Sequence, residues 1–529
     1  MSIGPDSTKN RLIRRSVTIG TASNFVGQLV AFAVSLLLTP FLLRQLGPVV
    51  YGLWVLVGAM AAYGAILDFG VWGTIIKYVA EYRAQGDEVS AHRLLHTMFY
   101  FYLGMCAFIS IIGFAIAPLF PHVFRLPPEQ HNLARVLVIL MSLATGLTLP
   151  CMISLAVLRG LQRYDIVNLI EVITSLLTAA ATVAVLLLGG GVIGVVGVNI
   201  GGLFVMLILG REAVRRIAPE LSIVRPLPGG AVHPLRDPQI TRVAFAHSWP
   251  LFVQAVASRL QSRTDEITIG LFLPVSQVGA YSIARRLSET TQTLTRQFMK
   301  TLLPLASQLH AEQDMARLRA VYKTGTRLAL ALILMLSALL FAFAGSILTV
   351  WVGAEYAMYA NVVAILALAN LIMTMRGCAA VVLQATARHR ILAITSLSAG
   401  LANLGLSLLL VRPLGLPGIA LGTVIPAALE YFCIILPYSL RVTRVSISEA
   451  WDEIFAPALL PLLPMLAVLY VLRASFGLFS LPVILAAIAV GLLTYVAVYL
   501  ALADGVERRW LGDAILYLRR VRVAHFKWS

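Results

Sequence analysis

The sequence predicts an all-α membrane protein with about fourteen transmembrane helices. Of its 529 residues, 59% are hydrophobic and only 12% are charged, whereas a soluble domain carries roughly 25% charged residues. Apolar runs of roughly 20 residues, the length that crosses a bilayer, recur along the whole chain. Lys and Arg residues fall mostly in every second loop between these runs. These observations together exclude a soluble domain carried on a membrane anchor.

We expect the helices at approximately 16–43, 50–76, 94–117, 132–157, 167–188, 192–209, 243–272, 276–304, 326–351, 361–383, 391–411, 417–438, 455–472 and 481–503. The first run follows four basic residues, as a secretory signal would. It is too long for the apolar core of a signal peptide, and no small-residue cleavage site follows it. We therefore interpret it as the first transmembrane helix.

The distribution of Lys and Arg predicts the orientation of the chain. If the N-terminus is cytoplasmic, the inside segments hold 30 of the 41 Lys and Arg residues, and the outside loops hold four. Such a bias over short loops is the signature of cytoplasmic segments, so both termini are predicted to be cytoplasmic. The net charge of +17 follows this topology, and no nucleic-acid partner is expected. The basic tail 504–529 is typical of either an amphipathic segment on the inner leaflet or a solvated tail.

Similar segments recur along the chain and predict an internal repeat. Residues 157–166 close the fourth helix, and residues 382–391 close the tenth, 225 residues later. Tyr51 and Tyr281 open the second and eighth helices, at an offset of 230. An offset of six helices is even, so it predicts two parallel six-helix lobes with a site between them. The predicted domains are 1–209 and 243–438 for the lobes, 210–242 for a cytoplasmic linker, 439–503 for two appended helices and 504–529 for the tail.

Short motifs stand out along these helices. Arg44-Gln45-Leu46-Gly47 and then Tyr51-Gly52 follow the first helix, Leu67-Asp68-Phe69-Gly70 lies in the second, and Val278-Gly279-Ala280-Tyr281-Ser282 opens the eighth. With six plus six plus two helices, the chain resembles bacterial polysaccharide or O-antigen flippases of the multidrug/oligosaccharidyl-lipid/polysaccharide exporter superfamily. The resemblance covers the first twelve helices.

This resemblance implies a V-shaped pair of lobes in the bacterial inner membrane. It implies that alternating access moves an undecaprenyl-diphosphate-linked oligosaccharide from the cytoplasmic to the periplasmic leaflet, for O-antigen, exopolysaccharide or capsule. The fourteen-helix count is also similar to that of lipid II flippases, whose extra helices are associated with a groove for the lipid tail. The implied partners are the lipid-linked glycan and membrane lipids, with other polysaccharide-assembly proteins as further candidates.

Charged residues concentrate in the hairpin formed by the seventh and eighth helices, on both sides of Pro274: Arg259, Arg263, Asp265, Glu266, Arg285, Arg286, Glu289 and Arg296. Ionisable groups at membrane depth are costly and mark functional sites by default. Arg263 and Arg285 each lie eleven residues from Pro274, so they share a depth on the two helices. We therefore expect the hairpin to contribute to a buried polar site.

Five Arg against three acids leave two surplus positive charges in this hairpin. Guanidinium groups bind phosphate bidentately, so we assign Arg259, Arg263, Arg285 and Arg286 as diphosphate ligands, with Asp265, Glu266 and Glu289 as their charge partners. The alternative is that these Arg residues only pair with the acids to hold the hairpin together, or extend to an interface.

Asp68 is a second candidate, as an acid within a Gly-rich helix. It could bind a coupling proton or cation, or it could form an ion pair with an Arg across the lobe. Glu171, Arg376 and Glu430 are also predicted within the membrane, and we interpret them as contacts between helices. No catalytic residue and no cofactor are expected. No metal site is expected either, because the four cysteines are not spaced as metal ligands.

Other functions fit the sequence less well. A membrane glycosyltransferase or polymerase would show catalytic acids on a sizeable outer loop, but the longest one, 118–131, has only Glu129. No phosphate-binding loop of an ATPase is present. A multidrug exporter of the same superfamily is the nearest rival, although it would usually have twelve helices and favour acids over Arg. A scaffold without transport activity would have a dry, charge-paired interface between the lobes.

Overall fold

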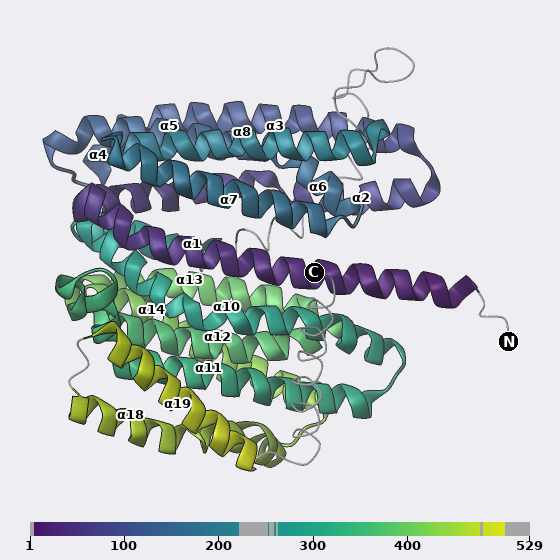
Figure 1. The fold of residues 1–529 in the computed structure, drawn as a ribbon, viewed down its shortest axis with the longest axis vertical. Coiled ribbons are helices and arrows are strands. Elements are labelled where there is room, and N and C mark those ends of the chain that lie inside the picture. Colours follow the sequence, from purple (N-terminus) through teal and green to yellow (C-terminus); the bar gives the residue numbers. More distant parts are fainter. Residues whose placement is uncertain are drawn as a thin grey trace, which may run out of the picture. The chain divides into compact units, whose positions relative to one another are not determined.

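The computed structural model describes residues 5–221, 263–476 and 480–502, together with residues 252, 256, 259 and 260. Side chains are described from residue 27 onward, except those of residues 294, 300 and 481. The secondary structure of this part of the chain is helical and includes no strand (Figure 1). Most of the predicted linker, the first part of the predicted seventh helix and the basic tail 504–529 lie outside the described residues.

The chain forms two compact units, which we describe separately. Unit 1 comprises Met1–Ile283 and Gly400–Ile419, and unit 2 comprises Ala284–Ala399 and Ala420–Ser529. The divisions fall inside three helices, α10 (Val275–Ala311), α13 (His389–Leu414) and α14 (Leu416–Leu429). The two compact units therefore differ from the two predicted lobes, and the boundaries of the lobes stay a prediction.

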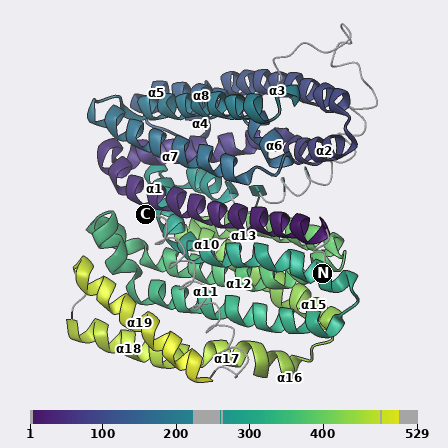
Figure 2. The ribbon, with the colours of Figure 1, turned by 45° about the vertical axis from the view of Figure 1, so that its right-hand side comes forward.

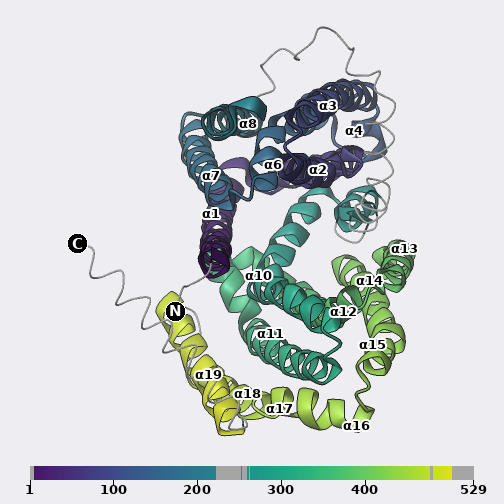
Figure 3. The ribbon, with the colours of Figure 1, turned by 90° about the vertical axis from the view of Figure 1, so that its right-hand side faces the viewer.

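Unit 1 is built mainly from the first eight helices of the chain: α1 (Pro5–Gly64), α2 (Val71–Gln85), α3 (Glu88–Ile116), α4 (Phe120–Val123), α5 (His131–Cys151), α6 (Ile153–Gly160), α7 (Tyr164–Leu187) and α8 (Gly191–Ile217). Short 3-10 turns lie at η1 (Ala65–Asp68), η2 (Pro128–Gln130) and η3 (Pro219–Leu221). Helix α3 packs along α5, and α7 packs along α8, as Figures 1 and 3 show. Fully buried Ile75, Leu95 and Leu155 lie in the core between α2, α3 and α6.

The first two predicted membrane helices are interrupted at glycines. Helix α1 turns at Gly47, whose φ of 74° and ψ of 163° are not helical. The second predicted helix is divided again, because Phe69 and Gly70 both have left-handed backbone angles between η1 and α2. Such angles cost little at glycine but are uncommon at a bulky residue. The strained Phe69 therefore marks a break that the rest of the unit must stabilise.

Unit 2 is built around α11 (Met315–Trp351), which contacts α12 (Ala360–Ala385), α15 (Leu436–Thr443), α17 (Ala456–Leu459), α18 (Leu462–Phe476) and α19 (Leu481–Leu502). The remaining elements are η5 (Ala354–Tyr359), α14 (Leu416–Leu429) and α16 (Ile447–Ala450). The two predicted appended helices pack on α11 (Figure 2), and their Met465, Leu469 and Ile484 belong to the hydrophobic core of the unit. Just before them in the chain, Glu449 and Glu453 pair with Lys323 of α11 at 2.8 and 2.7 Å. The two helices are thus part of the core of unit 2.

Two stretches of unit 2 are π-helical, Glu430–Ile435 and Trp451–Phe455. In each, the residue after the π-helix donates its N–H five residues back, from Leu436 to Tyr431 and from Ala456 to Trp451. A proline follows at once in both cases, Pro437 and Pro457. A proline ring clashes with the carbonyl four residues earlier in a regular helix, so a wider turn before it relieves that clash.

Eleven helical stretches of the described residues are long and apolar enough to cross a membrane, which supports a multi-pass membrane protein. One of them, residues 27–85, contains parts of two predicted spans joined at Gly47. Helix α10, which carries Arg285, Arg286, Glu289 and Arg296 of the hairpin, is not among the eleven. The count of fourteen, the repeat and the location of the termini therefore stay predictions.

Candidate functional site

The described part of the predicted hairpin, its tip and the helices next to it, forms a helical hairpin. Residues 263–272 are helical, the helix ends at Leu273-Pro274, and α10 begins at Val275. The Leu273 N–H donates to the Ile269 carbonyl at 2.8 Å, and the Gln277 N–H donates to the Pro274 carbonyl at 2.9 Å. Pro274 has no N–H to continue the first helix, so it fixes the tip of the hairpin.

Near its tip, the hairpin crosses α1 within unit 1 at two glycines. A Cβ on Gly52 would overlap the Val275 carbonyl oxygen, and a Cβ on Gly279 would lie 2.9 Å from Tyr51 Cδ1. Tyr51 and Tyr281 are 1% and 0% exposed. Small residues allow helix backbones to approach closely in membranes. Two of the motifs that carry the family resemblance, Tyr51-Gly52 and Val278-Gly279-Ala280-Tyr281-Ser282, therefore meet at one close helix crossing.

Two acids of the hairpin are buried in unit 1, and both have polar contacts. Asp265 Oδ2 accepts a hydrogen bond from the Tyr281 hydroxyl at 2.6 Å. Glu266 Oε1 lies 3.6 Å from Arg263 Nη1, and the Glu266 side chain is 2% exposed while that of Arg263 is 42% exposed. The Tyr63 hydroxyl lies 2.6 Å from Thr264 Oγ1, so α1 also contacts the hairpin. A buried carboxylate is tolerated when polar groups hydrogen-bond to it or an opposite charge pairs with it.

The unit 2 part of α10 carries a second polar row. Arg285 Nε donates to Glu289 Oε1 at 2.9 Å, with side-chain exposures of 16% and 45%. One turn later, Gln292 Nε2 donates to the Asn370 carbonyl at 3.2 Å. Arg296 Nη2 donates to Gln292 Oε1. This row links α10 to α12 through polar groups.

The predicted diphosphate ligands divide between the two units. Arg259 and Arg263 belong to unit 1, where the Arg259 carbonyl accepts a long hydrogen bond of 3.5 Å from the Tyr63 hydroxyl. Arg285 and the partly buried Arg286 belong to unit 2. Arg263 pairs with Glu266 and Arg285 pairs with Glu289, so at least two of the four predicted ligands already contact acids. A single anion site made of all four stays a prediction.

Asp68 lies at the helix break of unit 1. Its Oδ1 accepts a hydrogen bond from the Trp72 N–H at 3.2 Å and another from the Tyr102 hydroxyl. The described residues form no ion pair with Asp68, so the alternative of an Arg partner finds no support among them. The carboxyl group caps the first turn of α2, since the backbone N–H groups there have no helical acceptor.

The three intramembrane charges left as helix contacts form two ion pairs. Arg159 Nη2 lies 2.7 Å from Glu171 Oε1 and joins α6 to α7. Arg376 Nε lies 2.9 Å from Glu430 Oε1, and Arg376 also donates to Ser396 Oγ on α13. Glu430 is 6% exposed. Only the spatial structure brings Arg376 and Glu430 together, because they are 54 residues apart.

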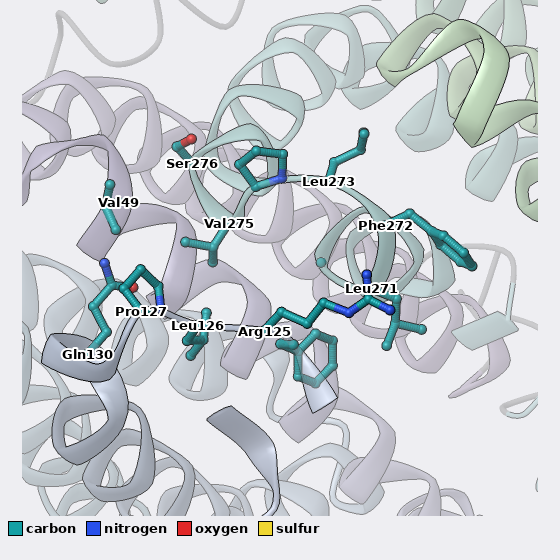
Figure 4. Close-up of a pocket in the computed structure, with 13 residues that line it drawn as sticks. Val49, Arg125, Leu126, Pro127, Gln130, Leu271, Phe272, Leu273, Val275 and Ser276 are labelled. Carbon is teal, nitrogen blue, oxygen red and sulfur yellow. The ribbon is translucent and has the colours of Figure 1, made fainter. Parts of the chain in front are cut away.

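The described residues of unit 1 line two cavities of note. The first, of about 380 Å³, lies at the hairpin tip, and Arg125 extends across it towards Leu271 and Phe272 (Figure 4). The guanidinium of Arg412 lies over the Phe272 ring, 5.4 Å from its centroid. The second, of about 410 Å³, has mostly apolar walls that include Met60, Tyr63, Leu67, Ile112 and Phe252. Tyr63 links this second cavity to the hairpin through Thr264.

No cluster of three or more metal-ligating side chains occurs among the described residues. The four cysteines are free thiols, three of them buried. The polar contacts described in the hairpin and beside it are ionic and hydrogen-bonding, and Arg, Tyr and carboxyl groups contribute to them.

A family model described as polysaccharide biosynthesis protein matches residues 17–310, more than half of the chain. The chain belongs to this polysaccharide biosynthesis family. The matched region runs from α1 to the end of α10 and includes the charged hairpin. The resemblance predicted from the sequence is thereby confirmed at the level of the family.

A curated relative is the probable low-salt glycan biosynthesis flippase Agl15 of Haloferax volcanii, 24% identical over 259 residues. The match covers 49% of this chain and 54% of the relative. The chain thus spans about half the length of the curated relative it matches.

Solved structures with the same fold include two kinds of transporter. The lipid II flippase MurJ in an inward closed conformation aligns with a TM-score of 0.71 and 14% identity, covering 93% of this chain and 100% of MurJ. An inward-facing multidrug resistance MATE transporter of the MOP superfamily aligns with a TM-score of 0.59 and 16% identity, covering 80% and 95% of the two chains. At such identities the likeness establishes the fold alone.

Proposed function

We propose that this member of the polysaccharide biosynthesis family is a flippase for a lipid-linked oligosaccharide. The observation that carries the proposal is the family match over residues 17–310, and the printed name of the Haloferax relative, a glycan biosynthesis flippase, supports it. The proposal places the chain in the bacterial inner membrane as a transporter rather than an enzyme. Its cargo is an undecaprenyl-diphosphate-linked glycan for O-antigen, exopolysaccharide or capsule, moved outward by alternating access of two six-helix repeats.

Matching turns in the two predicted repeats support a duplicated architecture. Gln162 and Ala387, 225 residues apart, have φ angles of 60° and 57°. The three residues that end each turn donate their N–H groups to carbonyls at the same relative positions. The capping residues also match. Asp87 caps α3 and Asp314 caps α11, and the side chain of each accepts a hydrogen bond from the backbone N–H three residues later. A parallel repeat is the arrangement that allows two lobes to alternate around one site.

Arg259, Arg263, Arg285 and Arg286 are proposed to bind the diphosphate. Arg263 is 42% exposed and lies at a loose 3.6 Å from its acid, a geometry in which an incoming phosphate can compete for the guanidinium. Arg285 is held more tightly by Glu289, at 2.9 Å. Phosphate offers paired oxygens to the planar guanidinium. If each Arg leaves its acid partner to bind the phosphate, substrate binding would be coupled to a rearrangement of the hairpin.

Gene deletion tests the proposed cargo. Loss of the protein should stop surface polysaccharide while lipid-linked units accumulate on the inner leaflet, and purified protein in proteoliposomes should move the lipid-linked oligosaccharide. Normal glycans with increased sensitivity to cationic drugs would instead favour a multidrug exporter, for which the mostly apolar cavity beside Tyr63 would be the binding site. Failure of peptidoglycan precursor export would favour a lipid II flippase.

A charge swap separates binding from scaffolding in the hairpin. Arg285→Glu combined with Glu289→Arg keeps the i,i+4 ion pair but moves the guanidinium by one helical turn, about 5.4 Å. If Arg285 binds the diphosphate, the swapped protein should fold like the wild type, by thermal unfolding in detergent, yet lose flipping. If flipping recovers with folding, the pair is structural and the diphosphate binds elsewhere.

A further inference from the structure

The turn between α12 and α13 in unit 2 matches the turn between α6 and α7 in unit 1. In unit 1, Arg163 N donates to the Leu158 carbonyl at 2.9 Å, and in unit 2, Arg388 N donates to the Leu383 carbonyl at 2.7 Å. Each turn carries one left-handed residue just before its Arg. The two backbones thus present Arg163 and Arg388 in the same local geometry.

The charges around these two Arg residues are opposite. In unit 1, Arg163 forms two hydrogen bonds of 3.0 Å with the carboxylate of Asp165, two residues later. In unit 2 the equivalent position is Arg390. Arg388 and Arg390 are exposed, and neither forms an ion pair with another described residue. One turn is therefore neutralised internally, and the other concentrates two positive charges.

Beside the second turn lies a cavity of about 310 Å³ lined by Arg388, Arg390, Ile391, Ile394 and Tyr438. We call it the basic pocket. Arg388 is oriented by Tyr438, because Nη1 donates to the Tyr438 hydroxyl at 2.8 Å and the guanidinium lies 5.5 Å from the ring centroid. Stacking on an aromatic face and a hydroxyl acceptor restrict the rotamers of Arg388. The remaining guanidinium donors stay available to a ligand.

We propose that the basic pocket binds the phosphate of an anionic phospholipid in the cytoplasmic leaflet. Two guanidinium groups suit a phosphate, and basic pockets between transmembrane helices on the cytoplasmic side recognise lipid head groups. The side of the membrane follows from the distribution of Lys and Arg. Ile394, 56% exposed, continues the pocket wall along α13 towards the bilayer. This apolar wall favours a lipid, whose acyl chain can cover Ile394, over free phosphate.

The probe is dioleoyl-phosphatidylglycerol, compared with dioleoyl-phosphatidylcholine at the same concentration. Binding to the full-length protein is measured by native mass spectrometry from detergent. The wild type should retain phosphatidylglycerol preferentially. Arg390→Asp should reproduce the neutral turn of unit 1, so the variant should keep its thermal stability but lose the preference. Removing both charges with R388A/R390A should weaken binding by about 30-fold, since each basic residue contributes about 1 kcal/mol near an anionic surface.

The matched control is R215A/R216A, which removes two exposed Arg residues from the end of α8, where both pair with Glu212. This control should keep the lipid preference. Equal loss in the control would overturn the basic pocket as the site, and so would a wild type that binds both lipids equally. Inorganic phosphate that displaces phosphatidylglycerol at equal concentration would overturn the lipid as occupant. None of these readouts depends on glycan flipping.

Discussion

Two acids lie at distorted helices of the predicted membrane spans, one in each unit, and their surroundings differ in charge. Glu430 opens the π-helix of unit 2, is 6% exposed and pairs with Arg376 at 2.9 Å. Asp68 ends the 3-10 turn of unit 1 and accepts hydrogen bonds from Tyr102 and Trp72, which are neutral donors.

This difference indicates different roles for the two acids. Loss of the Glu430 carboxylate would leave Arg376 in the protein interior without this ion-pair partner. Protonation of Asp68 breaks no ion pair with a described residue, and its two donors can remain in place. We therefore expect Glu430 to be structural, whereas Asp68 is the better candidate for a coupling proton or cation.

The largest expected effect comes from removing the cation in unit 2. Arg376→Met should destabilise the protein by about 3 to 5 kcal/mol, because it leaves Glu430 buried without its cation. Thermal unfolding in detergent measures this loss. The double variant R376M/E430L removes both charges and should recover most of the stability. A single variant as stable as the wild type would contradict the structural role.

A smaller loss of stability is expected at Asp68. Asp68→Ala leaves the Trp72 N–H and the Tyr102 hydroxyl without their acceptor, which costs about 1 to 3 kcal/mol for buried groups. Asp68→Asn keeps an oxygen acceptor and should remain within about 1 kcal/mol of the wild type. If Asp68 binds the coupling ion, the Asn variant should fold normally but lose the pH or ion dependence of flipping. Unchanged dependence would assign Asp68 to helix capping alone.

The Arg159–Glu171 pair of unit 1 tests how exposure reduces the effect of breaking a pair. Its side chains are 29% and 39% exposed, and pairs with access to solvent contribute about 0 to 1 kcal/mol. Glu171→Gln should therefore lower the melting temperature far less than Arg376→Met. A comparable loss would show that the environment of Arg159 is as poorly solvated as that of Arg376.

The smallest effect is expected at Asp87, a capping acid outside the membrane spans. Its hydrogen bonds with Ser90 hold the pKa of this carboxyl below its usual value. A lowered pKa in the folded state means that the stabilisation is present above the unfolded pKa and is lost as the pH falls through the folded pKa. Asp87→Asn should remove this acid dependence while the melting temperature at neutral pH hardly changes. A large shift at neutral pH would contradict simple capping.

Much of the fold follows from local sequence patterns, whereas the pairing of charges does not. The apolar runs predict the helices, and Pro274 predicts the tip of the hairpin because it cannot donate an N–H. The left-handed Phe69 has no comparable signal beyond its neighbour Gly70. Nothing in a linear pattern reveals that Arg376 meets Glu430 or that the Tyr281 hydroxyl reaches Asp265, since helix packing decides both contacts. The π-helices did have a signal, because a proline follows each one.

The π-helix at Glu430–Ile435 also determines which way the end of its helix faces. A wide turn holds one more residue than a regular turn, and each residue of an α-helix advances the side chains by about 100°. Deleting a single residue there would rotate everything downstream by about that angle. Buried Ser439 and Leu440 would turn out of the core of unit 2, and Tyr438 would turn away from Arg388. The position of the Tyr438 ring beside Arg388 thus depends on the length of the chain two turns earlier.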